Sequence, residues 1–283
     1  MAVITISRGC FSHGKEIAEK VAEMLGFECV SREILIEAVR FFDISEKELL
    51  RSLHDAPSVL ERMTHGREKY LSYIQVALLE HVKKDNVVYH GHAGHLLLPN
   101  IPHVLKVRIL AELEERVKLL QQEKKISKDE ALAFIRNDDR ERANWTRYLY
   151  KTEISDPGLY DMVLNIGRLK IKDACDIICM AAKSETYTST AESRKAVENL
   201  ALSSHVKAAL QDICDAEVRS ESGQVYIKVK GQKLRKTGGA SREVQQKVRE
   251  QIRADLRREI THKVRKIPGV KEIFCDIDLP YYS

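Results

Sequence analysis

Residues 3–25, with the sequence VITISRGCFSHGKEIAEKVAEML, decide the fold of the N-terminal part of the chain. Residues 3–7 form an apolar, β-branched run that predicts a strand, and residues 15–25 have the apolar spacing of a helix. Between them, residues 9–15 follow the pattern G-x-x-x-x-G-K. In a loop between a strand and a helix, this pattern directs backbone N–H groups at phosphate oxygens, and the lysine adds a full positive charge. The segment therefore predicts a phosphate-binding loop.

The predicted loop assigns a set of residues to nucleotide binding, namely Gly9, Ser12, His13, Gly14, Lys15 and Glu16. Lys15 is also predicted to act in catalysis, because its ammonium group would reach the terminal phosphates. Most such loops have Ser or Thr after the lysine, where the hydroxyl helps to hold magnesium. This chain has Glu16 there, so magnesium would need another protein ligand, or water and nucleotide oxygens alone. No metal-ligating residue is assigned.

The rest of the chain divides into two predicted domains. Short apolar strands alternate with helices over residues 1–182, which predicts an α/β, three-layer domain with a parallel sheet. Residues 183–196 are rich in Ser and Thr and are predicted to be a linker. Residues 197–283 read as helix, two strands, helix and strand, a small α+β (αββαβ) domain.

The composition indicates a globular protein. Of the 283 residues, 43% are hydrophobic and 31% are charged, which excludes a disordered or collagen-like chain. The sequence has neither a transmembrane run nor a signal peptide, so we expect a cytoplasmic protein. Residues 233–266 hold twelve Lys and Arg against four acids, a local charge of +8 in a chain of net charge +5. This basic segment predicts an anionic ligand or a solvated helix; it has no aromatic residue to stack on bases, so nucleic acid is disfavoured.

A second candidate segment is the arginine-rich run at residues 136–147, RNDDRERANWTR. Phosphoryl transfer needs cations around the oxygens that gain charge, and arginines on a mobile segment commonly supply them. On a helix, Arg136 and Arg140 share one face, as do Asp139 and Arg142. Taken alone, the run is also typical of a solvated helix with internal ion pairs.

A third candidate is the turn HGHAGH at residues 90–95. It follows a predicted strand, and ligands of open α/β sheets bind at the carboxyl ends of the strands. Three histidines raise the alternative of a metal site, but no neighbouring acid completes a ligand set. We interpret the turn as lining the substrate site.

Several of these segments, in this order, resemble the cytidylate kinase-like family of P-loop kinases over residues 1–182. They are ITISRGCFSHGKEIAEKVAEMLGF, SREIL, NVVYHGHAGHLLLP, VRILAELEERVKLL, DDRERANWTRYLY and DPGLYDMVLNIGRL. The resemblance implies a nucleoside-monophosphate-kinase fold, ATP as donor, Mg²⁺ as cofactor and a lid that closes over the phosphates. Residues 197–278 resemble a BON domain, on the hairpin glycine and the late IPGV.

The resemblance also implies roles for individual residues. Arg136, Arg140 and Arg142 would be catalytic lid arginines, and Arg32, His92, Asp139 and Arg142 would bind the acceptor. Two positions differ from the family pattern, since Ser31 replaces an Asp and His92 stands where an Arg is usual. The expected function is ATP-dependent transfer to a small phosphorylated acceptor such as CMP. The alternative is a nucleotide-binding regulator without turnover, which signals through the C-terminal domain.

Overall fold

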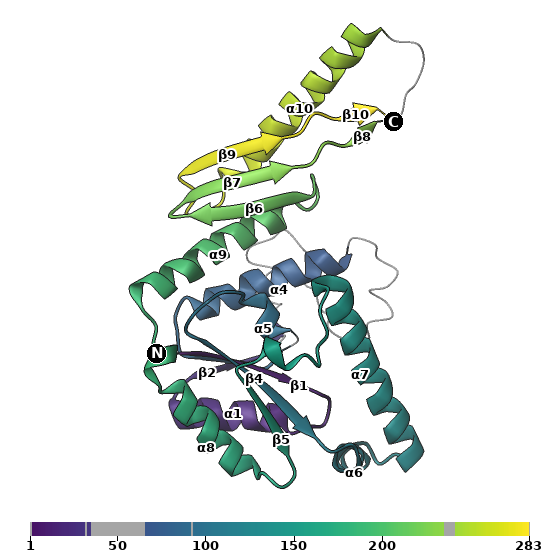
Figure 1. Cartoon of the computed structure of the whole chain (residues 1–283), viewed down its shortest axis with the longest axis vertical. Helices are drawn as coiled ribbons and strands as arrows, with labels where there is room; N and C mark the ends of the chain where they lie inside the picture. The colour runs from purple at the N-terminus through teal and green to yellow at the C-terminus, as the bar shows by residue number, and fades with distance from the viewer. Residues whose placement is uncertain (1, 32, 35–65, 92, 235–240, 283) are drawn as a thin grey trace. The chain divides into compact units, whose positions relative to one another are not determined.

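The chain forms two compact units (Figure 1). The computed structural model describes residues 2–31, 33–34, 66–91, 93–234 and 241–282. Unit 1 comprises residues 1–68 and 77–194, and unit 2 comprises residues 69–76 and 195–283. Among the described residues, no helix is long and apolar enough to cross a membrane.

Unit 1 contains a five-stranded parallel sheet in the order β2-β3-β1-β4-β5 (Figure 1). Its strands are β1 (Val3–Arg8), β2 (Glu28–Val30), β3 (Val87–Tyr89), β4 (Val104–Ala111) and β5 (Met162–Ile166). Among the described residues before residue 190, the helices include α1 (Gly14–Leu25), α4 (Gly66–Val82), α5 (Gly94–Leu97), α6 (Leu113–Lys124), α7 (Lys128–Tyr150), α8 (Ile171–Ala182) and the 3-10 turns η2 (Pro157–Leu159) and η3 (Glu185–Tyr187). The predicted three-layer α/β fold is confirmed.

The central strand β1 explains why the sequence reads as it does. Its residues 3–7 are all buried, as expected of a strand covered on both faces. On one face, Ile17 and Val21 of α1 pack with Ile178 of α8 against the sheet. Ile4 pairs in register with Val88 of β3 and with Leu105 of β4. Because these strands are parallel, the turns that follow β1 and β3 lie at the same edge of the sheet.

Unit 2 has the predicted αββαβ order, with three of its strands in one sheet. Its main elements are α9 (Ala191–Leu210), β6 (Ala216–Glu221), β7 (Gln224–Val229), α10 (Arg242–Val264) and β9 (Glu272–Ile277). Strands β6 and β7 form an antiparallel hairpin, and β9 pairs parallel to β7. Val206 of α9 and Ile260 of α10 pack with Ile227 of β7 to form the core.

Two features of this half of the chain were not predicted. Residues 191–196, assigned to the linker, are the first residues of α9. The Ser and Thr residues there cap the helix, since Thr190 N–H donates to Ser193 Oγ at 2.8 Å and Ser193 N–H donates to Thr190 Oγ1 at 3.1 Å. Two short strands, β8 (Lys233–Leu234) and β10 (Tyr281–Tyr282), pair in parallel and fix the end of the chain.

Candidate phosphate-binding site

The predicted phosphate-binding loop lies between β1 and α1, at the carboxyl end of the central strand. Phe11 and His13 adopt left-handed backbone conformations, with φ of 54° and 61°. The Ser12 hydroxyl donates to the Gly9 carbonyl at 2.9 Å. A Cβ at Gly14 would lie 2.4 to 3.0 Å from side-chain atoms of Arg8, so the second glycine of the motif is required by close packing. Glycine, backbone shape and position all fit a loop that holds phosphates.

Lys15 is the first charged side chain of α1 and is available to a ligand. Its side chain is 66% exposed, and its Nζ lies 3.7 Å from Glu19 Oε1, a surface pair of small energetic value. Phosphate oxygens at the helix N-terminus would therefore compete for Lys15 with one weak partner only among the ion pairs described here.

Glu16 stands where a magnesium-binding hydroxyl is usual and has its own partners. Lys20 Nζ donates to its carboxylate at 2.6 Å, and His13 Nδ1 lies at 3.3 Å. The hydrogen bond from Lys20 holds the pKa of Glu16 below its usual value. His13 also approaches Glu115 of α6 at 3.4 Å. The loop fits the phosphates of ATP, but these side chains do not form a ligand set for Mg²⁺.

Arg116 of α6 contacts the phosphate-binding loop at Cys10. The sequence analysis did not identify this residue. Its Nε donates to the Cys10 carbonyl at 2.8 Å, and its Nη1 and Nη2 donate to the Asp139 carboxylate at 2.8 and 2.7 Å. The side chain is 11% exposed. The only sequence signal is its place in the helix after β4, whereas its partners are 106 and 23 residues away.

The structure brings only part of the arginine-rich run to the loop. Asp139 reaches Arg116, and through it the loop. Arg142 donates to Asp138 of its own helix at 2.5 Å, and Arg140 donates to Asn137 at 2.6 Å. Arg136 is exposed on α7. The carboxylate of Asp139, expected to bind the acceptor, is thus oriented by an arginine of the chain itself.

Cys10, Asp138 and Asp139 bring three metal-ligating atoms within 4.8 Å of one another. Arg116 occupies this cluster, since its Nη2 donates both to Cys10 Sγ at 3.4 Å and to Asp139. Burial raises the pKa of Cys10 to about 11, so the thiol is protonated near neutral pH. A hard cation such as Mg²⁺ prefers oxygen ligands, so the cluster fits an arginine better than a magnesium ion.

The turn after β3 is built around Tyr89. A Cβ at Gly91 would lie 2.1 Å from the Tyr89 hydroxyl oxygen, and one at Gly94 would lie 2.4 Å from the ring. His90 and His95 are both buried, and the His95 ring packs against Tyr160 with centroids 4.6 Å apart. The packed tyrosine accounts for both glycines of the turn. His92 and Arg32, the other expected acceptor contacts, lie outside the described residues.

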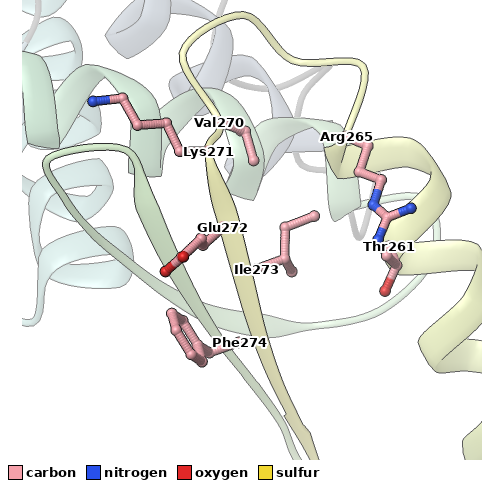
Figure 2. Close-up of a pocket in the computed structure, with 7 residues that line it drawn as sticks. All are labelled: Thr261, Arg265, Val270, Lys271, Glu272, Ile273 and Phe274. Carbon is pink, nitrogen blue, oxygen red and sulfur yellow. The ribbon is translucent and has the colours of Figure 1, made fainter.

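A separate hollow of about 400 Å³ lies in unit 2, between the end of α10 and β9 (Figure 2). Figure 2 shows Ile273 projecting from β9 toward Thr261 and Arg265, whereas Glu272 and Phe274 project from the other side of the strand. The hollow is lined by Thr261, Arg265, Val270, Lys271, Glu272, Ile273 and Phe274. Among the ion pairs of the described residues, none involves Arg265 or Lys271.

Comparison with known proteins finds relatives for the part of the chain that carries this loop. The model of the cytidylate kinase-like family matches residues 3–168, which include the loop, Arg116 and α7. A cytidylate kinase of Methanosarcina barkeri is 34% identical over 114 residues, 36% of this chain and 62% of that protein. One of Pyrobaculum islandicum is 29% identical over 195 residues, 63% of this chain and 94% of that protein.

The first relatives are covered only in part, since the chain spans 52% to 62% of the length of three of them. Among solved structures, an uncharacterized protein from Eubacterium ventriosum has a TM-score of 0.49 at 17% identity, covering 65% of this chain and 100% of that one. Unit 2 beyond residue 194 lies outside the family match. On the match to residues 3–168, the chain belongs to the cytidylate kinase-like family.

Proposed function

We propose that the protein transfers a phosphoryl group from ATP to a small phosphorylated acceptor, with a nucleoside monophosphate, first of all CMP, as the substrate. The observation that carries the proposal is the loop at residues 9–15, with Lys15 exposed at the start of α1. The cytidylate kinases among the relatives support the choice of acceptor. Because ATP is the donor, the proposal places the protein in the cytoplasm.

Little covalent chemistry is required of the chain itself. Bound ATP supplies the phosphoryl group, and the residues align the donor and acceptor phosphates and neutralise their charge. Lys15 and the N–H groups at the start of α1 hold the terminal phosphates. Arg136, Arg140 and Arg142 on α7 would provide cations for the oxygens that gain charge. Arg142 and Arg140 would exchange their present partners Asp138 and Asn137 for phosphate.

Four residues are assigned to the acceptor side. Arg32, His92, Asp139 and Arg142 are its candidate contacts. An arginine would bind phosphate through a permanent bidentate charge, whereas His92 does so only when protonated. An acceptor other than CMP is therefore part of the test, and magnesium is included in it because the loop side chains do not form a set of ligands for that ion.

The test is ADP production from ATP and Mg²⁺ by the purified protein, with CMP, dCMP, UMP, AMP or no acceptor. We expect acceptor-stimulated turnover that Lys15→Ala lowers by about 10²–10³-fold, in the range found when one charge-stabilising group is removed. Lys118→Ala, an exposed lysine on α6, is the matched control and should retain turnover within about twofold. Near-normal turnover in the folded Lys15→Ala variant would rule the proposal out.

A second candidate function is nucleotide binding without turnover, with the signal passed on by unit 2. Glu16 favours it, because its carboxylate stands in place of a magnesium-binding hydroxyl and is already paired with Lys20. ATP binding by calorimetry, together with no stimulation by any acceptor, would select this function over the first.

We also propose the hollow of unit 2 as the place for an anionic ligand, the alternative to a solvated helix at the basic segment (Figure 2). Arg265 lies beside the apolar side chain of Ile273, and the lining also holds a second cation, Lys271, and the carboxylate of Glu272. Binding of small ligands is one of the functions that a BON-like domain would have. Pyrophosphate titrated into the Lys15→Ala protein should bind, and the added substitution Arg265→Gln should weaken this binding about tenfold, the effect of one lost charge-assisted contact. Equal binding by both proteins would exclude the hollow as the site.

A further inference from the structure

The guanidinium group of Arg116 forms hydrogen bonds on two sides, to Cys10 of the loop and to Asp139 of α7. On one side, Nε donates to the Cys10 carbonyl at 2.8 Å and Nη2 lies 3.4 Å from Cys10 Sγ. On the other side, Nη1 and Nη2 form a two-pronged pair with Asp139 of α7 at 2.8 and 2.7 Å. One buried side chain therefore joins the phosphate-binding loop to α7, and the planar fork of arginine is the group that can do so.

The first glycine of the loop motif makes room for this arginine. A Cβ at Gly9 would lie 3.0 Å from Arg116 Nη2 and 3.2 Å from Cζ. The φ of Gly9 is outside the left-handed range, so the backbone itself does not demand glycine there. The guanidinium thus packs against the loop at the point where the chain leaves β1.

The neighbouring acid on α7 shows that the link is specific. Asp138 accepts a hydrogen bond from Arg142 of the same helix, four residues away, and this bond does not join α7 to another element. Asp139 instead reaches a different helix. At the C-terminal end of α7, Arg147 forms a similar two-pronged pair with Glu153, at 2.6 and 2.9 Å, but this pair is exposed and lies away from the loop residues. It provides a matched control.

We propose that Arg116 is a positioning residue that couples the phosphate-binding loop to α7, so that occupation of the loop by phosphate fixes the helix that carries the lid arginines. The coupling rests on the proposed function, because the lid arginines matter only if phosphoryl transfer occurs. In this arrangement Asp139 orients Arg116, and this role replaces the acceptor contact considered for Asp139 under the proposed function.

The kinetic test separates the two ends of the link. Asp139→Asn should lower kcat about tenfold and leave the KM for ATP within about threefold, because the contact of Arg116 with Cys10 remains. Arg116→Gln should lower kcat and also raise the KM for ATP about tenfold, because the loop loses its support. Glu153→Gln breaks an arginine–carboxylate pair of the same chemistry and should change both constants less than twofold.

A second measurement needs no nucleotide, and Cys10 is its reporter. Cys10 is 6% exposed and sits under Arg116, whereas Cys29 is exposed and serves as an internal reference. Beyond the effect of burial, Arg116 lowers and Asp139 raises the pKa of Cys10, so labelling with N-ethylmaleimide is followed by peptide mass spectrometry at several pH values to separate access from the thiolate fraction. The pH-independent rate constant of the Cys10 thiolate should be about tenfold higher in Arg116→Gln and higher by a smaller factor in Asp139→Asn. Glu153→Gln should label like the parent protein. Arg116→Lys keeps the positive charge but lacks the planar guanidinium group, and it replaces Arg116→Gln in the experiment if that variant does not fold.

The outcomes distinguish the coupling from the function on which it rests. Unchanged Cys10 labelling in both Arg116→Gln and Asp139→Asn would overturn the coupling. So would an Asp139→Asn protein in which only the KM for the acceptor rises, because Asp139 would then be an acceptor ligand. A parent protein without turnover would defeat the proposed function, and faster Cys10 labelling in the two variants would still support the link between loop and α7.

Discussion

Helices α7 and α10 are both 23 residues long and both rich in arginine, yet they use their charges differently. α7 carries five Lys and Arg residues and five acids, whereas α10 carries seven and four. Asp139 of α7 bonds to another helix, while Asp255 of α10 pairs with Arg258 and Gln251 of its own helix. The charge content of a helix therefore does not show whether it serves a site. What shows this is which other element the side chains of the helix contact.

The apolar residues of the two helices differ in the same way. In α10 they recur at every fourth position, a row made of Val244, Val248, Ile252, Leu256, Ile260 and Val264. Only the last two are buried, and the first two are 50% and 43% exposed. In α7, Ala131 and Ile135 are fully buried in a cluster with Cys10 of the loop. The core thus continues beneath the site along α7, whereas α10 leaves the core of unit 2 halfway along its length.

The largest expected effect tests this difference in burial. Ile135→Ala on α7 and Ile260→Ala on α10 should each cost about 2–5 kcal/mol of unfolding free energy, because both side chains are fully buried. Val248→Ala, in the same row as Ile260, should change it by less than about 0.5 kcal/mol. Urea unfolding followed by far-UV circular dichroism measures all three, and the fluorescence of Trp145, the one tryptophan of the chain, reports separately on unit 1. A cost above about 1 kcal/mol for Val248→Ala would mean that the row on α10 is covered, contrary to the comparison.

The next effect concerns turnover. Arg142→Ala on α7 should lower the rate of ADP formation about a hundredfold, as expected when a cation near the transferred group is removed. Arg253→Ala on α10 removes the same side chain from a helix of the same length and should leave the rate within about twofold. Equal losses in the two variants would show that α10 also serves the reaction.

A smaller effect on stability is expected at the N-caps of the two helices. Both have a serine N-cap, but Ser127 of α7 forms a full capping box with Glu130, whose carboxylate accepts from the Ser127 N–H at 2.8 Å. Ser241 of α10 accepts one bond from Val244 N–H at 3.4 Å. Ser127→Ala should cost about 1 kcal/mol, and Ser241→Ala only a few tenths, by urea unfolding. A larger loss at Ser241 would contradict this ranking.

The same caps explain how far the sequence could be used for prediction. The structure places residues 136–147 on one helix, as the sequence analysis assumed, because local signals, a Ser cap and apolar spacing, fix the bounds of α7. Residues 191–196 read as an irregular polar stretch from local signals, whereas in the structure they begin helix α9. Strands β8 and β10 were missed because two-residue strands have no period of their own. Arg116 was missed for a related reason, since its role depends on residues far away in the chain, which no single segment shows.

The smallest effect depends on pH and belongs to unit 1. Burial, and secondarily Arg8, holds the pKa of His90 below its ordinary value of 6.5. The folded state then binds fewer protons than the unfolded chain once the pH falls below about 6.5, so the contribution of His90 to stability is complete above that pH and is lost as the pH falls toward the folded pKa. His103, also buried with a lowered pKa, acts with the same sign. The thermal midpoint reported by Trp145 should therefore fall between pH 7.5 and pH 5.5, and should fall less in His90→Asn, which has no group to titrate there. Parallel pH profiles for the two proteins would assign the acid sensitivity of unit 1 to other groups.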